Sequence, residues 1–433
     1  MTGQILVSLL SLGLCIFNGS GKDVRNNPAL AAGTFYVYDY GCAPALNPAP
    51  DGFSPFYISH FARHGARYCT GEYDSLYGWL VKAADDNLLT AEGREFLSRY
   101  EDFYSKVRFC KGNLTDIGKA QHRAIASHMF ERFPELFEGE TMLEARSTES
   151  PRVIMSMWNF ISELQMLDDD IDVDADASAS FASWLQPSLS SNPYLVRNAF
   201  KICGAAEDKV AEYFNSTVPV KKILARFFIS ADAPRNIGTT EEKFISTLFA
   251  VVSCARCLDE NRDCFDDVFS DEEKFRIWKG LSARYFMETA SFDGSECLAV
   301  DYAAFTLRHI IESADADISS GKKGLQLRFG HDSGIAPLLA FLDVNGFGRK
   351  AESVNEIFSI FPNYNIPMGA SLQLVFYRNR DGEILVRVLL NEAEASLPLP
   401  AVNGSFYRWE EFKAQYMPLI EASEQKIRLD VRK

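Results

Sequence analysis

The sequence predicts an α/β fold, in which a mixed, mostly parallel sheet is flanked by helices and carries an inserted, mainly helical cap. Short apolar runs such as 54–60 end in polar loops and are followed by helical patterns. Two β-rich runs joined by a turn lie late in the chain, at 371–390. The stretch from about 180 to 320 is mainly helical. Strands that alternate with helices are typical of an α/β domain.

The chain divides into four expected parts. We expect a leader at 1–20, the first part of the core at 21–165, the cap at 166–299 and the second part of the core at 300–433. The apolar run 5–17 is too short to span a bilayer but is typical of a signal peptide, although residues 1–4 carry no Lys or Arg. A buried N-terminal helix is the alternative. The leader predicts export, periplasmic or secreted, without a stable membrane anchor.

The first part of the core is predicted from apolar spacing and capping residues. A strand at 54–60 precedes helices near 74–87, 91–108 and 116–133, and Thr115 is the expected N-cap of the third helix. A second strand at 141–146 leads to a helix with Pro151 in its first turn.

An acidic segment follows that helix. Residues 170–176 alternate acidic and apolar side chains, which predicts a strand with one acidic face. The segment fails as a calcium loop, because Ala175 stands where Gly is required and Phe181 where Glu is required.

The rest of the chain predicts the cap and the second part of the core. The clearest cap helix is at 241–258. A strand at 325–330 runs into a loop and then a helix. The runs 371–378 and 383–390 are joined by a turn that ends at Gly382, which predicts a hairpin.

Charge and composition exclude several classes of function. The net charge of −15 disfavours binding to nucleic acid or to an anionic membrane surface. A small anionic substrate is still compatible with this charge, because a pocket of arginines acts locally. The hydrophobic fraction of 47% is enough for a sizeable core.

The cysteines suggest disulfides. Nine are present, and eight remain without Cys15 of the leader: Cys42, Cys69, Cys110, Cys203, Cys254, Cys257, Cys264 and Cys297. An even number in an exported chain is typical of disulfide pairing, but the partners are not determined. The Cys254-x-x-Cys257 pair could be half of a zinc site, yet a second such pair is missing. We expect no metal and no cofactor.

Chemistry-bearing residues follow three of the predicted strands. Arg63-His64-Gly65-Ala66-Arg67 comes after the first strand. Arginine guanidinium groups bind phosphate oxygens in pairs, and an imidazole between two of them can attack phosphorus. Arg152 lies in the first turn of a helix, where free N–H groups also attract anions. His331 can donate to a phosphate oxygen, and Asp332 can protonate a leaving alkoxide.

These motifs resemble those of the histidine acid phosphatases, a branch of the histidine phosphatase superfamily that includes phytases. RHGAR at 63–67, HFARHGARY at 60–68, ARSTESPRVIMS at 145–156, LTDIGKAQHRAIASHMFERFPELF at 114–137 and PMGASLQLVFYR at 367–378 carry the resemblance. It is greatest to the bacterial multiple inositol polyphosphate phosphatases. The resemblance implies that His64 is the nucleophile and Asp332 the proton donor. Arg63, Arg67, Arg152 and His331 would bind phosphate.

Two positions depart from the family pattern. Cys69 stands where the family often has Pro, whereas Thr70 is kept and is expected among the substrate-binding residues. The inositol polyphosphate branch usually has His-Ala-Glu, but this chain has His331-Asp332-Ser333. The acid would therefore move to Asp332.

The expected function is hydrolysis of phosphomonoesters through a phosphohistidine. Inositol polyphosphates such as phytate are the first substrate hypothesis. Smaller esters such as sugar phosphates are the second, and a phosphomutase or a non-catalytic phosphoester-binding protein are further alternatives. A phytase needs basic residues beyond the central arginines, and Lys201, Lys221, Lys222 and Arg226 are candidates in the cap.

Overall fold

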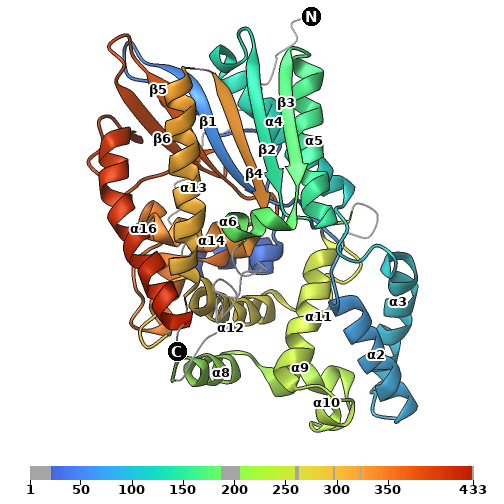
Figure 1. Ribbon diagram of the computed structural model, residues 1–433. Helices are drawn as coiled ribbons and strands as arrows, with labels where there is room; N and C mark the ends of the chain where they lie inside the picture. The colour runs from blue at the N-terminus through green and yellow to red at the C-terminus, as the bar shows by residue number, and fades with distance from the viewer. Residues whose placement is uncertain (1–20, 187–204, 259–262, 296–297, 322, 432–433) are drawn as a thin grey trace, which may run out of the picture.

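An eight-stranded mixed sheet forms the centre of the computed structural model, which describes residues 21–186, 205–258, 263–295, 298–321 and 323–431 (Figure 1). The strand order is β3-β2-β4-β1-β5-β6-β7, and β8 pairs with β6. The strands are β1 (Ser54–Arg63), β2 (Thr141–Ser147), β3 (Ile171–Ala177), β4 (Gly324–Gly330), β5 (Ser371–Arg378), β6 (Ile384–Leu390), β7 (Ala393–Glu394) and β8 (Phe406–Arg408).

The sheet has a parallel half and an antiparallel half. Strands β3, β2, β4 and β1 are parallel to one another, whereas β5 pairs antiparallel with β1 and with β6. The predicted mixed α/β fold and the late hairpin are confirmed. The antiparallel half extends beyond that hairpin, because β7 and β8 also pair with β6.

Helices cover both faces of the sheet and bury two hydrophobic clusters. Side chains of β1 alternate between them, so that Tyr57 and Phe61 face one cluster and Ile58 and Ala62 the other. Because β1 is buried on both faces, its sequence is a nearly continuous apolar run. Helices α4 (Asp116–Arg132) and α5 (Pro151–Leu167) cover one face, and α13 (Ala299–Ser320), α14 (Asp332–Phe341) and α16 (Trp409–Val431) cover the other.

Smaller helices gather at the end of the sheet toward which β2, β3 and β4 point (Figure 1). They are α2 (Glu72–Asp85), α3 (Ala91–Val107), α8 (Ala205–Thr217), α9 (Val220–Phe227), α10 (Ala233–Asn236), α11 (Glu241–Ala255) and α12 (Asp271–Thr289). Short helices α1 (Gly21–Asn26), η1 (Pro28–Phe35), α6 (Ala182–Leu185) and α15 (Val354–Ile360) complete this layer. The cap thus covers the carboxyl ends of the parallel strands, where ligands of such sheets bind.

The division between core and cap differs from the expected boundaries at 166 and 299. Strand β3 pairs with β2 and belongs to the sheet, although it lies within the expected cap segment. Helices α2 and α3 lie within the expected core segment but pack against α11 and α9. Local patterns identify these elements but not their partners, which are distant in the sequence.

Several predictions concern termini and cysteines. The predicted leader at 1–20 lies outside the described residues, as do Lys201, Cys203 and Cys297. Within the described residues, no helix is both long enough and apolar enough to cross a membrane. Cys42, Cys69, Cys110, Cys254, Cys257 and Cys264 are free thiols in the structure.

Candidate active site

The three predicted motifs follow neighbouring strands. Arg63 at the end of β1 is in register with Gly330 at the end of β4, and Ser147 at the end of β2 is in register with Phe329 of β4. The His64 N–H donates to the Gly330 carbonyl across 3.0 Å. Parallel pairing therefore brings the loops after β2, β4 and β1 to one edge of the sheet.

His64 lies at the centre of this edge and is only 2% exposed. Its Nδ1 is 2.9 Å from the Gly65 carbonyl oxygen. Since a carbonyl only accepts, Nδ1 carries the ring hydrogen and Nε2 keeps a free lone pair. Burial, together with nearby Arg63, His331 and the other arginines, holds the pKa of His64 well below its usual value. The imidazole is thus neutral and suited to nucleophilic attack through Nε2.

Three arginines surround the imidazole. Arg63, Arg67 and Arg152 each have a buried Nε that finds no hydrogen-bond partner among the described residues. A buried donor without a partner costs free energy, and three such donors beside one histidine define a site for an anion. Burial and the proximity of Arg67 lower the pKa of Arg152 to about 10, because like charges crowd this space. A bound anion would relieve that repulsion.

The guanidinium of Arg63 is held firmly. Its Nη1 donates to the carbonyl oxygens of Thr34 and Ile366, and the residue is 1% exposed. Arg67 is held by a bond from Nη1 to the Tyr68 carbonyl, 2.9 Å away. These backbone contacts orient both groups before any ligand binds.

Asp332 pairs with Arg63, at 3.3 Å between Oδ2 and Nη2. Its Oδ1 accepts from the Ser333 N–H, and the N-cap of α14 is His331, so Asp332 is not the N-cap. Burial acts to raise the pKa of Asp332, but Arg63, His331 and Arg67 outweigh it and lower the pKa. The carboxyl group is therefore ionised over most of the pH range until an anion competes for Arg63.

His331 faces His64 with ring centroids 5.5 Å apart. Arg152 donates from Nη2 to Nδ1 of His331 across 3.3 Å, and Thr148 Oγ1 is 3.2 Å from Nε2. Since Arg152 can only donate, the ring hydrogen of neutral His331 is on Nε2 and points to Thr148. The predicted hydrogen bond from His331 to a phosphate oxygen thus requires Thr148 or Arg152 to give up its contact. Sequence reasoning missed the positioning role of Thr148.

The loop after β1 rests directly on the start of α4. A Cβ on Gly65 would lie 2.4 Å from the Gly118 carbonyl oxygen, and a Cβ on Gly118 would lie 2.2 Å from that of Ala66. Both glycines are needed for this close approach, whereas the sequence suggested a tight turn at Gly65. The N-cap of α4 is Thr115, as predicted, and its hydroxyl also donates to the Ala66 carbonyl.

Two buried polar side chains hold the same loop, and sequence reasoning missed both. Gln121 Oε1 accepts from the Ala66 N–H at 2.8 Å, and Ser156 Oγ accepts from the Gly65 N–H at 3.1 Å. Each lies on a helix that faces the loop, and nothing in its local pattern distinguishes it from an ordinary helix residue. Their role becomes visible only when α4 and α5 pack on the sheet.

The remaining polar candidates are engaged by neighbouring carboxylates. The exposed Thr70 donates its hydroxyl to Glu72 at 2.9 Å. Arg146 forms ion pairs with Glu144 and with Asp174. Lys222 and Arg226 of the cap both pair with Glu273.

A cavity of about 260 Å³ adjoins the arginines on the cap side. Thr34 and Phe35 line this cavity. The Thr34 carbonyl oxygen accepts a hydrogen bond from Arg63, and the Phe35 ring lies under the Arg67 guanidinium. Tyr285 also lines it, and its hydroxyl is buried without a hydrogen-bond partner among the described residues. Burial and then nearby Asp332 raise the pKa of Tyr285, so this neutral hydroxyl lies close to the catalytic candidates.

The charges around this cavity are mixed. Its described charged residues are Glu72, Lys243, Arg284 and Glu288. Arg284 is neutralised by Glu242, 2.9 Å away. Burial raises the pKa of Glu288 to about 7, although Arg284 opposes the shift.

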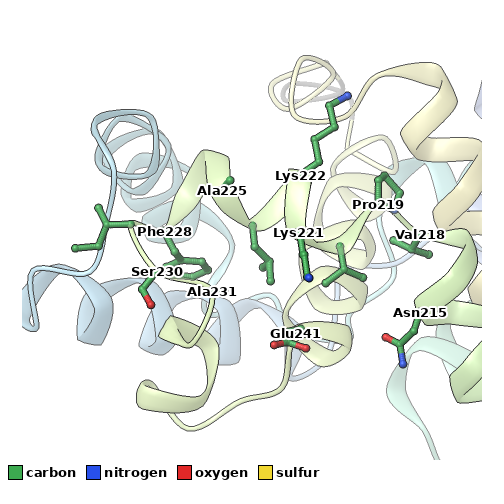
Figure 2. A pocket seen from close by; sticks show the side chains of 13 residues that line it. Asn215, Val218, Pro219, Lys221, Lys222, Ala225, Phe228, Ser230, Ala231 and Glu241 are labelled. Carbon is green, nitrogen blue, oxygen red and sulfur yellow. The ribbon is translucent and has the colours of Figure 1, made fainter.

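A second cavity, of about 620 Å³, lies within the cap between α9 and its neighbours. Lys221 and Lys222 line it together with mainly apolar residues. In Figure 2 the Lys222 amino group points away from the other labelled side chains. Neither of these two cavities is lined by His64 or by its arginines. The smaller cavity is connected to them through Thr34 and Phe35, so the larger volume of this cavity does not make it the reaction site.

Comparisons with known proteins agree with the predicted family. The histidine phosphatase superfamily (branch 2) matches residues 60–186. A search of curated proteins found no match. The multiple inositol polyphosphate phosphatase of Bifidobacterium longum, solved with inositol hexasulfate, is 20% identical with a TM-score of 0.71, over 88% of this chain and 96% of that chain.

Two phytases share the fold as well. The phytase from D. castellii is 18% identical with a TM-score of 0.65, over 90% of this chain and 85% of that chain. The phytase from Klebsiella sp. ASR1 is 14% identical with a TM-score of 0.54, over 88% of this chain and 98% of that chain. The match over residues 60–186 agrees with the family predicted from the RHGAR motif, and the fold is that of these phosphatases.

Proposed function

We propose that this chain is a member of the histidine phosphatase superfamily (branch 2), whose model matches residues 60–186, and that it hydrolyses phosphomonoesters through a phosphohistidine on His64. One observation carries the proposal. The unprotonated Nε2 of a neutral imidazole lies among three arginines whose buried Nε groups have no partner among the described residues. Such a site holds the phosphoryl group and stabilises its equatorial oxygens during in-line attack.

The first step transfers the phosphoryl group to the enzyme. His64 Nε2 forms a bond to phosphorus while the ester P–O bond breaks. The departing oxygen takes the proton of the Asp332 carboxyl group. Phosphate binding promotes this role, because an anion on Arg63 weakens the ion pair that keeps Asp332 ionised. Asp332 thereby becomes protonated when substrate is bound.

The second step returns the enzyme to its starting state. Water attacks phosphorus, the N–P bond breaks, and Asp332, now ionised, accepts the proton of the water. The Nδ1–H of His64 stays on the Gly65 carbonyl throughout, which keeps Nε2 aimed at phosphorus. Inorganic phosphate then leaves the arginines.

Inositol polyphosphates are the proposed substrates. The structure of the Bifidobacterium longum protein holds inositol hexasulfate, and two phytases have the same fold. The cavity beside the arginines could receive the inositol ring, since Thr34 and Phe35 connect it to Arg63 and Arg67.

A second candidate is an ester with fewer phosphates, such as a sugar phosphate. The mixed charge of the cavity favours it. Each further phosphate needs a cation, but Glu72 and Glu288 add negative charge to this wall and Arg284 is already paired. Free hydroxyl groups, in contrast, are compatible with carboxylates.

The central test is phosphate release from phytate, glucose 1-phosphate and p-nitrophenyl phosphate by wild type and by the His64→Ala variant. We expect wild type to turn over at least one ester and His64→Ala to lose activity by about 10³-fold or more. Rapid quenching in base after mixing with ³²P-labelled substrate should trap an acid-labile label on wild type only.

The matched control is His128→Gln, because His128 is paired with Glu392 and lies outside the site. This variant should keep both turnover and label. Full activity in His64→Ala would overturn the proposal, and so would an inactive wild type.

Glu288→Gln tests which substrate class the cavity accepts. The Glu288 carboxylate forms above its pKa of about 7 and then repels a second phosphate. The variant should raise kcat/KM for phytate relative to glucose 1-phosphate by roughly fivefold above that pH, which corresponds to about 1 kcal/mol. Well below that pH the ratio should not change. An unchanged ratio at every pH would show that the inositol ring does not occupy this cavity.

A further inference from the structure

Three thiols lie together behind the phosphate-binding loop. Cys69 follows Arg67 by two residues, and Cys254 and Cys257 are at the end of α11. All three are fully buried. The Cys69 Sγ is 3.6 Å from the Ala250 carbonyl, one turn before Cys254. The Cys254 thiol is in hydrogen-bond contact with the thiols of both Cys69 and Cys257.

The arrangement fits sulfur–sulfur chemistry better than metal binding. Among the described residues, the only group of three ligand atoms within 4.8 Å of one another is Asp168, Asp169 and Asp170, so the three sulfurs do not form such a group. Cys257 N–H donates to the Cys254 carbonyl at 2.9 Å, which places these two residues on one tight turn. Cys254 contacts both of the other thiols, so it has two possible disulfide partners, Cys69 and Cys257.

We propose that Cys69 and Cys254 form a disulfide that links the phosphate-binding loop to cap helix α11, and that Cys257 is the thiol that can exchange with it. The disulfide would join Cys69, two residues after Arg67, to helix α11. Earlier turns of α11 line the cavity next to the anion site. The disulfide would therefore fix the cap relative to the arginines. The inference rests on the thiols and holds whatever ester the enzyme prefers.

The reaction is a thiol–disulfide exchange with a low-molecular-weight disulfide, RSSR. One thiolate attacks RSSR, giving a mixed disulfide and one RSH; the second protein thiolate then displaces the other RSH. The protein loses two electrons and RSSR gains them. Cys257 can next attack the sulfur of Cys254, release Cys69 as a thiol and leave a Cys254–Cys257 disulfide.

Burial decides when the exchange takes place. The three thiols are inaccessible in the folded chain, and burial raises the pKa of Cys254, so that its thiolate is scarce there. The disulfide should therefore form while the chain folds or when α11 separates from the loop. Once formed, it should resist reduction until the cap opens.

The test uses the full chain, refolded in a buffer of oxidised and reduced glutathione. Remaining thiols are alkylated, and the unreduced protein is digested and analysed by mass spectrometry. We expect a peptide pair joined through Cys69 and Cys254. The oxidised protein should melt roughly 5–10 °C above its fully reduced form, because the link closes a long loop.

Variants separate this disulfide from other effects. Cys69→Ala should remove the increase in melting temperature that oxidation gives to wild type. Cys110→Ser replaces a partly buried cysteine outside the cluster and should leave that increase unchanged. Alkylated Cys69 in the oxidised wild type would overturn the proposal. A Cys254–Cys257 disulfide as the only product would overturn it as well. Loss of phosphatase activity has no bearing on either reading.

Discussion

At the scale of single residues, one backbone carbonyl determines which nitrogen of His64 reacts. The Gly65 oxygen takes the hydrogen on Nδ1, and burial among cations keeps the ring neutral. As the proposed nucleophile, His64 therefore needs no separate general base. The arginines proposed to bind the phosphate also help to keep His64 unprotonated, so the same charges would serve binding and activation.

If Asp332 is the proton donor, as proposed, the reaction should favour acid. Its pKa is lowered in the free enzyme, because Arg63, His331 and Arg67 outweigh burial. The protonated form, which donates to the leaving group, therefore declines as pH rises through that lowered pKa, and kcat/KM should fall from an acidic maximum. The measurement is kcat/KM across pH for wild type and for Asp332→Asn.

The leaving group provides the control for that experiment. Asp332→Asn should lose about 10²–10⁴-fold on glucose 1-phosphate, whose alkoxide needs a proton. The loss should be clearly smaller on p-nitrophenyl phosphate, because p-nitrophenolate departs readily without one. Equal losses on both esters would show that Asp332 does not act as the acid.

At the scale of elements, the backbone of the loop after β1 and the backbone of α4 come so close at Gly65 and Gly118 that neither position has room for a Cβ. Gly118→Ala would place a Cβ 2.2 Å from the Ala66 carbonyl oxygen, which the loop can accommodate only by moving. We expect a destabilisation of about 1–3 kcal/mol and a loss of turnover, measured by denaturant unfolding and by kcat.

Gly78→Ala is the matched control, since Gly78 lies in helix α2 and a Cβ there meets no atom within 4 Å. It should stabilise the protein by up to about 1 kcal/mol through helix propensity and leave kcat unchanged. If Gly118→Ala behaved like this control, the close approach would not support the site.

The same elements show how far sequence reasoning reaches. Local signals are sufficient for Thr115 as the N-cap of α4, for Pro151 at the start of α5 and for the β5–β6 hairpin, because capping and turn residues act within a few positions. The sequence also predicted that the RHGAR and His331-Asp332 motifs lie close together, because the loops that follow neighbouring parallel strands meet at one edge of the sheet. Their individual roles stay predictions until variants are assayed.

The contacts that sequence reasoning missed depend on distant packing. Thr148 is 183 residues from His331, and Gln121 is 55 residues from Ala66. Strand β3 shows the same limit at the level of an element: its acidic alternation predicts a strand, but only pairing with β2 shows that it belongs to the sheet.

At the scale of the whole molecule, buried histidines limit stability in acid. His60 and His122 are fully buried, and burial lowers the pKa of each to about 3. Between the usual pKa near 6.5 and that value, the unfolded chain binds protons that the folded chain does not. The free energy of unfolding should therefore decrease as the pH is lowered through this window, by about 1.4 kcal/mol per pH unit and per histidine.

Denaturant unfolding from neutral to acidic pH measures this slope. His122→Gln should make the slope shallower, because one of the buried histidines with a lowered pKa no longer titrates. A lower stability of the variant at neutral pH does not affect the comparison, which concerns the slope only. An identical slope in wild type and variant would rule out His122 as a source of acid sensitivity.

The strand order has a consequence for biosynthesis. Strands β1 and β2 do not pair with each other, because β4 lies between them and pairs with both. On the ribosome, β1 and β2 therefore emerge long before the strand at 324–330 that joins them. Until it arrives, the nascent chain carries two incomplete strand edges and His64 has no partner loop from residues 331 and 332. Under the proposed mechanism, the active site can therefore form only after residue 332 has been synthesised, late in translation.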